Sequence, residues 1–142
     1  MNNLLVDTNV VLDLLAKRQP FYDHAAQIFS LADKGKINLA VGSLTFANTN
    51  YVLGKLKSPK EAREILRRFR ILVKILPLND KVVDLALNSK FSDFEDGLQY
   101  YSAQENEQDV IITRDLSDFR ESKIPVLTPE EYLISLERQA GN

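Results

Sequence analysis

The sequence predicts an α/β fold: a three-layer α/β/α arrangement around a central, mainly parallel sheet of four to five strands. Two observations predict it. Short apolar runs alternate with longer stretches of helical periodicity, and most of the runs lack the alternation of a half-exposed strand. Such runs are typical of strands buried on both faces of a sheet. A chain of 142 residues has the size of about one domain, so we expect residues 1–142 to form a single unit.

Five apolar runs are the predicted strands. They are short and rich in leucine or β-branched residues, which favours extended structure over a buried helix. The first four cover residues 4–6, 37–41, 71–76 and 110–112, and a weaker fifth covers residues 125–127.

Stripes of apolar residues at helical spacing lie between these runs and predict the helices. Gly35 ends the first of them, and Ser58-Pro59 opens the second. The last helix has the clearest start, because Thr128-Pro129-Glu130-Glu131 is a capping box with proline at the first helical position. We expect residues 139–142 to fray. The stripes cover residues 21–32, 62–69, 82–86, 98–103 and 132–136.

Composition excludes several classes of site. The chain has no cysteine and one histidine, His24, which excludes disulfide scaffolds, zinc ribbons, iron–sulfur clusters and thiol nucleophiles. The net charge of −2 offers no overall basic field, so RNA would need a local basic patch or a metal. No apolar run approaches the length of a membrane span, and Asp7 and Asp13 interrupt the apolar start. We therefore expect a soluble cytoplasmic protein with no membrane segment.

Acidic residues follow two of the strongest predicted strands. Asp7 follows the first, and Asp115, with Asp118 one turn on, follows the fourth, while Asp93 and Asp96 stand at a predicted helix start. Ligands of open α/β sheets bind beyond the carboxyl ends of the strands. Carboxylates that converge there repel one another unless they take up protons or a cation neutralises them. Oxygen ligands without histidine or cysteine select Mg²⁺ or Mn²⁺.

Two groups of basic residues are candidate RNA contacts. Arg114 stands beside Asp115, where a guanidinium can meet a phosphate in a bidentate contact. The densest basic cluster runs from Lys55 and Lys57 to Arg70, although a run of this kind is most often a solvated helix face.

Each of these residues also has a simpler possible role. Asp7 can cap the first helix, and Asp115 and Asp118 can cap a short turn. The segment Ser92-Asp93-Phe94-Glu95 is itself a capping box, and capping is the favoured role for its acids taken singly. For His24 we favour packing at a helix surface over catalysis.

Four segments, taken in order, resemble the PIN-domain nucleases, as in VapC-type toxins. The run Leu-Leu-Val-Asp-Thr-Asn-Val at 4–10 is similar to the opening strand of that family. Residues 95–103 resemble the helix of the third acid, and Thr-Arg-Asp at 113–115 followed by Asp-Phe at 118–119 resembles the fourth segment. Residues 124–129 resemble the family's final strand and turn. The resemblance covers nearly the whole chain.

The resemblance implies a metal-dependent endoribonuclease that hydrolyses RNA phosphodiester bonds with Mg²⁺ or Mn²⁺. It also implies a toxin silenced by an antitoxin protein, and a homodimer. Asp7, Asp96 and Asp115 would bind the metal, and Asp118 would join them as a catalytic acid. The residues that would support the site are Thr8, Asn9, Ser43, Asn48, Asp93 and Thr113.

One position departs from the family pattern. The family usually has a glutamate about five residues beyond the serine at position 43, and this chain has Asn48 there. An amide can accept a hydrogen bond from a metal-bound water but brings no charge, so cation affinity and water activation should weaken. We hypothesise that Asp93, near Asp96, compensates. The alternative function is a PIN-fold module that binds RNA or protein with weak or no nuclease activity. A haloacid-dehalogenase-like phosphatase is disfavoured, because Asn9 stands where its second aspartate belongs.

Overall fold

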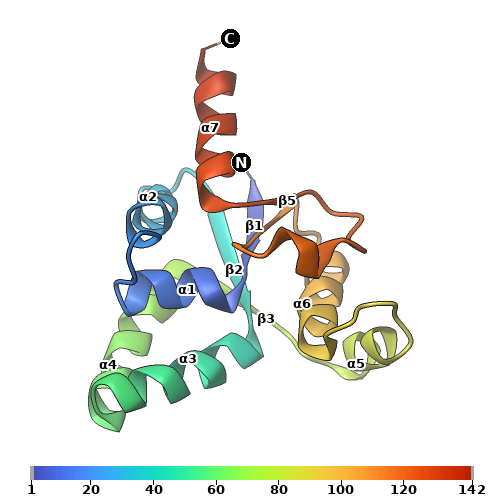
Figure 1. The fold of residues 1–142 in the computed structure, drawn as a ribbon, viewed down its shortest axis with the longest axis horizontal. Helices are drawn as coiled ribbons and strands as arrows, with labels where there is room; N and C mark the ends of the chain where they lie inside the picture. Colours follow the sequence, from blue (N-terminus) through green and yellow to red (C-terminus); the bar gives the residue numbers. More distant parts are fainter. Residues whose placement is uncertain (1, 142) are drawn as a thin grey trace.

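The computed structural model describes residues 2–141, in which strands and helices alternate along the chain (Figure 1). The strands are β1 (Asn3–Val6), β2 (Asn38–Gly42), β3 (Val73–Leu76), β4 (Val110–Ile112) and β5 (Val126–Leu127). The helices are α1 (Thr8–Leu15), α2 (Tyr22–Asp33), α3 (Ser43–Leu56), α4 (Pro59–Phe69), α5 (Asp80–Leu87), α6 (Phe94–Glu105) and α7 (Pro129–Ala140). Two 3₁₀ turns are η1 (Arg70–Leu72) and η2 (Leu116–Phe119).

The five strands form one parallel sheet in the order β3-β2-β1-β4-β5. The central strand β1 pairs Leu5 with Ala40 of β2 on one side and with Ile111 of β4 on the other. The direction in which strands are added reverses at β1. The strands β2 and β3 lie on one side of β1, and β4 and β5 lie on its other side. Crevices for ligands form at such a switch point, beyond the carboxyl ends of the strands.

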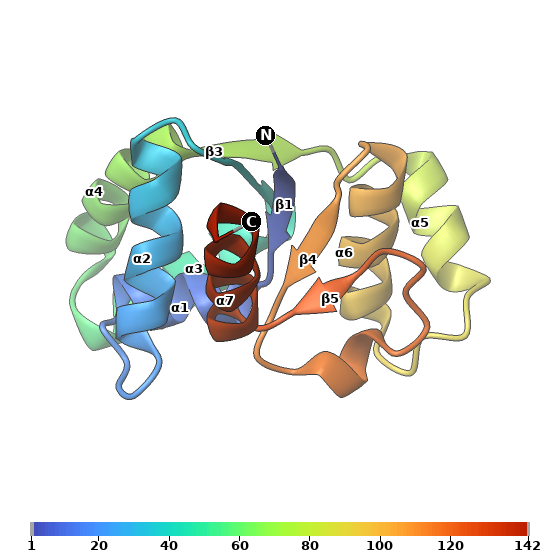
Figure 2. The ribbon, with the colours of Figure 1, turned by 90° about the horizontal axis from the view of Figure 1, so that it is seen from above.

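Alternate residues of the strands bury opposite faces of the sheet, which gives the three layers. Leu4 and Val6 pack with one group of helices, and Leu5 packs on the other face against Tyr100 and Ala103 of α6. Figure 2 shows α1, α2 and α4 on one side of the sheet and α6 and α5 on the other. The core on the face of Leu4 and Val6 is formed with helices α1, α2, α4 and α7, which contribute Val10, Ile28, Phe69 and Tyr132.

The predicted α/β class and the parallel sheet are confirmed, with changes at some boundaries. The expected strand 71–76 begins at Val73, because Arg70–Leu72 forms η1 and leaves Ile71 83% exposed. Thr128 caps α7 in the predicted capping box. Of the tail expected to fray, residues 139 and 140 belong to α7, and Asn142 lies outside the described residues. Within residues 2–141, every helix falls short of the length and apolar content that crossing a membrane requires.

Candidate active site

Asp7 is the central carboxylate at the carboxyl edge of the sheet. It follows β1 and caps α1, with Oδ1 accepting a hydrogen bond of 2.7 Å from the Thr8 backbone N–H. Gln99 Nε2 donates to the same oxygen at 2.8 Å, and the Thr113 hydroxyl donates to Oδ2 at 2.7 Å. Only 6% of Asp7 is exposed, and this burial raises its pKa despite the hydrogen bonds that favour the charged form. Asp7 therefore both caps α1 and lies at the centre of the candidate site.

Asp115 lies close to Asp7, beyond the end of β4. We call the region around Asp7, Asp96 and Asp115 the acidic corner. Asn9 Nδ2 lies 3.4 Å from Asp115 Oδ2 and 3.4 Å from Thr113 Oγ1, so the predicted supporting residues Asn9 and Thr113 bridge the two strand ends. The Asp115 backbone N–H donates to Thr113 Oγ1 at 3.1 Å. The negative charge of Asp115 adds to the increase in the pKa of Asp7. The parallel strands thus bring Asp7 and Asp115 together as the sequence predicts.

Asp96 lies in the first turn of α6, half-buried and surrounded by negative charge. Burial is the largest cause that raises its pKa to about 7, and the charges of Asp7, Asp93, Asp118 and Glu95 raise it further. Asp96 therefore shares an electrostatic environment with Asp7 at the end of β1, with Asp118 of η2 and with two acids at the start of its own helix. A cation at this corner would offset that repulsion.

The acids around the start of α6 have different partners. Asp93 is the N-cap, with Oδ1 accepting from the Asp96 backbone N–H at 3.0 Å. The capping box was expected to begin at Ser92, so the cap lies one residue later than predicted. Glu95 accepts a hydrogen bond from Asn48 Nδ2 of α3.

The start of α3 also packs against this corner. The hydroxyl groups of Thr8 and Thr45 lie 2.8 Å apart, which joins the first turns of α1 and α3. Ser43, a predicted supporting residue, is the first residue of α3 and is half-buried. Sequence reasoning missed Thr45 and Gln99. The spacing of Gln99 from Asp96 could have indicated Gln99, since residues three apart share one face of a helix. No local spacing indicates Thr45, whose contact with Thr8 joins two helices distant in the sequence.

The side chain of Arg114 is held by contacts with Asp13 and Phe21 of the same chain. Its Nε donates to Asp13 Oδ2 at 2.6 Å and its Nη2 to Asp13 Oδ1 at 3.3 Å, while its guanidinium carbon lies 3.9 Å from the Phe21 ring centroid. Arg18 donates to Asp13 as well, at 3.0 Å, and to the Asn9 backbone carbonyl at 3.2 Å. The Asp13 side chain is 1% exposed. Sequence reasoning missed this ion cluster, in which Arg114 is about a hundred residues from Asp13 in the chain.

Lys55 and Lys57 lie far from the acids. Both are exposed at the end of α3, and Lys55 Nζ lies 4.4 Å from the Tyr51 ring centroid. A helix rises 1.5 Å per residue, so the ten residues from Thr45 to Lys55 span about 15 Å. These lysines therefore extend the charged surface without joining the acidic corner.

The oxygen donors at this corner suit a hard divalent cation. Among residues 2–141, no three His, Cys, Asp or Glu side chains converge as a ready ligand set. Mg²⁺ commonly uses one or two carboxylates and keeps several waters, so pairs among Asp7, Asp96 and Asp115 suffice. The buried Gln99 Oε1 beside Asp7 has no hydrogen-bond partner in the described residues, and a hydrated cation would supply one.

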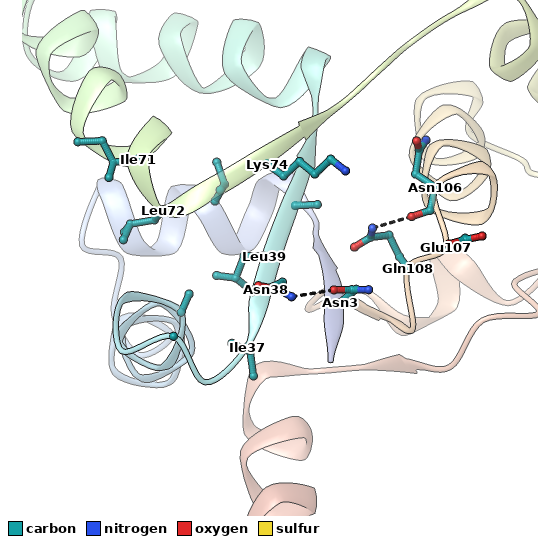
Figure 3. Close-up of a pocket in the computed structure, with 14 residues that line it drawn as sticks. Asn3, Ile37, Asn38, Leu39, Ile71, Leu72, Lys74, Asn106, Glu107 and Gln108 are labelled. Carbon is teal, nitrogen blue, oxygen red and sulfur yellow. Dashed lines mark hydrogen bonds between the residues drawn. The ribbon is translucent and has the colours of Figure 1, made fainter. Parts of the chain in front are cut away.

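A hollow at the amino-terminal ends of the strands, away from the acidic corner, is lined by different groups (Figure 3). Asn38 Nδ2 donates to Asn3 Oδ1 at 3.0 Å, and Gln108 Nε2 donates to the Asn106 carbonyl at 2.9 Å. This hollow lies at the amino ends of the strands, where parallel sheets seldom bind ligands. The acidic corner is therefore the candidate active site.

Residues 3–117 match the family profile described as PIN domain. The chain belongs to the PIN-domain family. Among curated proteins, this PIN domain is 30% identical over 134 residues to Ribonuclease VapC1 of Aquifex aeolicus (strain VF5), which covers 91% of this chain and 92% of that protein.

Solved structures also share the fold of this PIN domain. DNA-bound VapBC from Salmonella typhimurium aligns with a TM-score of 0.69 and 16% identity, covering 91% of this chain and 99% of that chain. A toxin–antitoxin complex from Klebsiella pneumoniae aligns with a TM-score of 0.67 and 22% identity, covering 89% and 97%.

Proposed function

We propose that this PIN domain is an endoribonuclease that hydrolyses RNA phosphodiester bonds with Mg²⁺ or Mn²⁺, and that it is the toxin of a toxin–antitoxin pair. The observation that carries the proposal is the grouping of buried Asp7 with Asp96 and Asp115 at the switch point of the sheet. The identity to Ribonuclease VapC1 over most of both chains supports the choice of RNA as substrate.

Different residues of the chain would bind the cation, orient the ligating carboxylate and accept a proton. Asp7, Asp96 and Asp115 would hold the cation, which when bound supplies a Lewis acid that lowers the pKa of water and offsets charge on phosphate. Thr113 and Gln99 hold both oxygens of Asp7 in place through hydrogen bonds. Such partners fix the orientation of a ligating carboxylate. Asp118 adds negative charge beside Asp96 and is the candidate proton acceptor.

The test is cleavage of total RNA by purified protein with Mn²⁺, with and without chelator. We expect cleavage with the metal, none with chelator present, and cleavage slower by about 100-fold or more in Asp7→Asn, which removes the ligand's charge while nearly keeping its shape. Circular dichroism checks that the variant is folded. Cleavage by folded Asp7→Asn at the wild-type rate would contradict the proposal.

A second candidate function is a PIN-fold module that binds RNA or protein with little hydrolysis. Asn48 favours it, because this position next to the acidic corner carries an amide and no charge. Retention of RNA without cleavage, together with no measurable Mn²⁺ binding, would support the binding module over the enzyme.

One surface of this protein is suited to binding an antitoxin. An apolar groove between α1, α3 and α4 carries basic side chains, so it suits a segment with apolar and acidic residues. Leu56, at this groove, is 64% exposed, and Leu56→Asp should weaken co-purification with a co-expressed antitoxin. The groove is lined by Leu14, Leu15, Leu56, Ile65, Phe69 and Leu72 together with Lys17, Lys57 and Arg68.

The homodimer also belongs to the proposal. Tyr51 on α3 is 63% exposed, which leaves an aromatic side chain available to a second copy. Sedimentation equilibrium of the isolated protein measures the mass, and a monomer at all concentrations would contradict the dimer.

A further inference from the structure

A side-chain hydrogen bond joins two helices beside the acidic corner. Asn48 Nδ2, on α3, donates to Glu95 Oε1, on α6. The two residues are far apart in the sequence, so the contact depends on how the two helices pack around the end of the sheet.

The helix face that carries Asn48 is directed toward Asp7. Thr45 lies three residues earlier on α3, and its hydroxyl is 2.8 Å from that of Thr8, the neighbour of Asp7. Residues three apart share one face of a helix. Asn48 therefore lies about one turn along α3 from the contact with the Asp7 segment.

The helix face that carries Glu95 is directed toward the same carboxylate. Gln99 lies four residues later on α6, and its Nε2 is 2.8 Å from Asp7 Oδ1. Residues four apart are stacked on one face, about 6 Å apart along the helix axis. Glu95 therefore lies about one turn before Gln99 on this face of α6, and it accepts a hydrogen bond from Asn48.

A small cavity lies where these faces meet. Its volume is about 10 Å³, and Glu95, Gln99 and Thr45 are among the residues that line it. That volume is about the minimum for one water molecule. Gln99 is 6% exposed, and its Oε1 has no hydrogen-bond partner within residues 2–141. A buried acceptor without a partner indicates a donor or a cation that the protein alone does not supply.

We propose that Glu95 is a further cation-binding carboxylate of this site and that Asn48 is the residue that positions it. The inference rests on the proposed metal-dependent function, because the ligand is the same Mg²⁺ or Mn²⁺. A neutral amide suits the positioning role, since it orients a carboxylate without cancelling its charge. A glutamate at position 48 would instead place a second negative charge against Glu95.

The experiment measures Mn²⁺ affinity by calorimetry, which does not depend on cleavage. Glu95→Gln keeps the shape and can still accept from Asn48 but removes the charge, and we expect at least about tenfold weaker Mn²⁺ binding. Asn48→Ala leaves Glu95 unoriented, and we expect about tenfold weaker binding. The double variant should bind no more weakly than Glu95→Gln, because the two residues act through one contact. Glu64→Gln, at an exposed glutamate of α4, is the matched control and should bind as wild type.

The outcomes separate this inference from the proposed function. Weaker Mn²⁺ binding by Glu95→Gln supports the inference even when the wild type cleaves no RNA, a result that would overturn the nuclease alone. Unchanged Mn²⁺ affinity in both single variants overturns the inference, and the nuclease stands if the wild type cleaves RNA. Absence of Mn²⁺ binding by the wild-type protein also overturns the inference. Thermal unfolding of each variant checks that the fold is retained.

Discussion

Asp7 and Asp13 lie at the two ends of one short helix and are both almost fully buried, yet their surroundings are opposite. Asp13 is held by two guanidinium groups, Arg114 at 2.6 Å and Arg18 at 3.0 Å. Within residues 2–141, Asp7 receives hydrogen bonds only from neutral groups, and the charges of Asp115 and Asp96 lie nearby. One carboxylate is compensated within the protein and the other is not.

The difference separates a structural carboxylate from one available to a ligand. A buried ion pair leaves little charge for an external partner and is costly to break. A buried carboxylate with neutral donors keeps its orientation but retains a need for positive charge. We therefore expect changes at Asp13 to affect stability first and changes at Asp7 to affect cation binding and cleavage first.

The largest expected effect is on catalysis. Asp7→Asn should lower the RNA cleavage rate by about 100-fold or more, because charge stabilisation by a metal is worth several kcal/mol. The measurement is cleavage at saturating Mn²⁺. Asp13→Asn, assayed well below its unfolding temperature, should retain far more activity, and equal losses in the two variants would contradict the distinction.

Stability should respond in the opposite order. Asp13→Ala leaves two arginines without their shared buried partner, and we expect the free energy of unfolding to fall by about 3 kcal/mol. Urea denaturation measures the change. Asp7→Asn should cost less than this, since the lost charge relieves repulsion with Asp115 and Asp96. A loss below about 1 kcal/mol in Asp13→Ala would show that the ion cluster contributes little.

The acidic corner should also give a distinct pH dependence. The pKa of Asp96 is raised from 3.8 to about 7, so between these values the folded protein binds more protons than the unfolded chain. Its contribution therefore makes stability fall as pH rises from about 4 to about 7. Burial raises the pKa of Asp7 and acts in the same direction.

Asp96→Asn tests this prediction without metal. After allowance for solvent screening of a half-exposed group, we expect the variant to gain about 1–2 kcal/mol over wild type at pH 8 and little at pH 4. Urea denaturation at both pH values measures the difference, and Mn²⁺ should reduce it by compensating the wild-type charge. A gain that is equal at both pH values would contradict an electrostatic cause.

The smallest expected effect concerns the ring beside Arg114. Phe21→Leu keeps an apolar side chain but removes the aromatic face that lies 3.9 Å from the guanidinium carbon. We expect the free energy of unfolding to fall by about 0.5–1 kcal/mol. Phe94→Leu, at another exposed phenylalanine, is the control. An equal loss in both variants would assign the effect to lost apolar contact.

Local patterns were sufficient for much of the fold and for part of the site. Apolar runs predicted the strands, and Ser58 and Thr128 marked helix starts that the structure confirms. Asp7 and Asp115 could be placed together because parallel strands end at one edge of the sheet. The 3₁₀ turn η1 was missed, since its apolar residues read as a continuation of β3.

The sequence by itself determined the strands, several helices and the end of the sheet where the acids gather, because periodicity and capping depend on residues close in the chain. The predicted apolar stripes covered neither α1 nor α3. Only the tertiary structure decided which side chains meet there. Arg114 pairs with Asp13, Gln99 donates to Asp7 and Asn48 donates to Glu95 because helices and loops distant in sequence pack at one end of the sheet. Their rotation about their axes follows from core packing across both faces, which a local pattern does not encode.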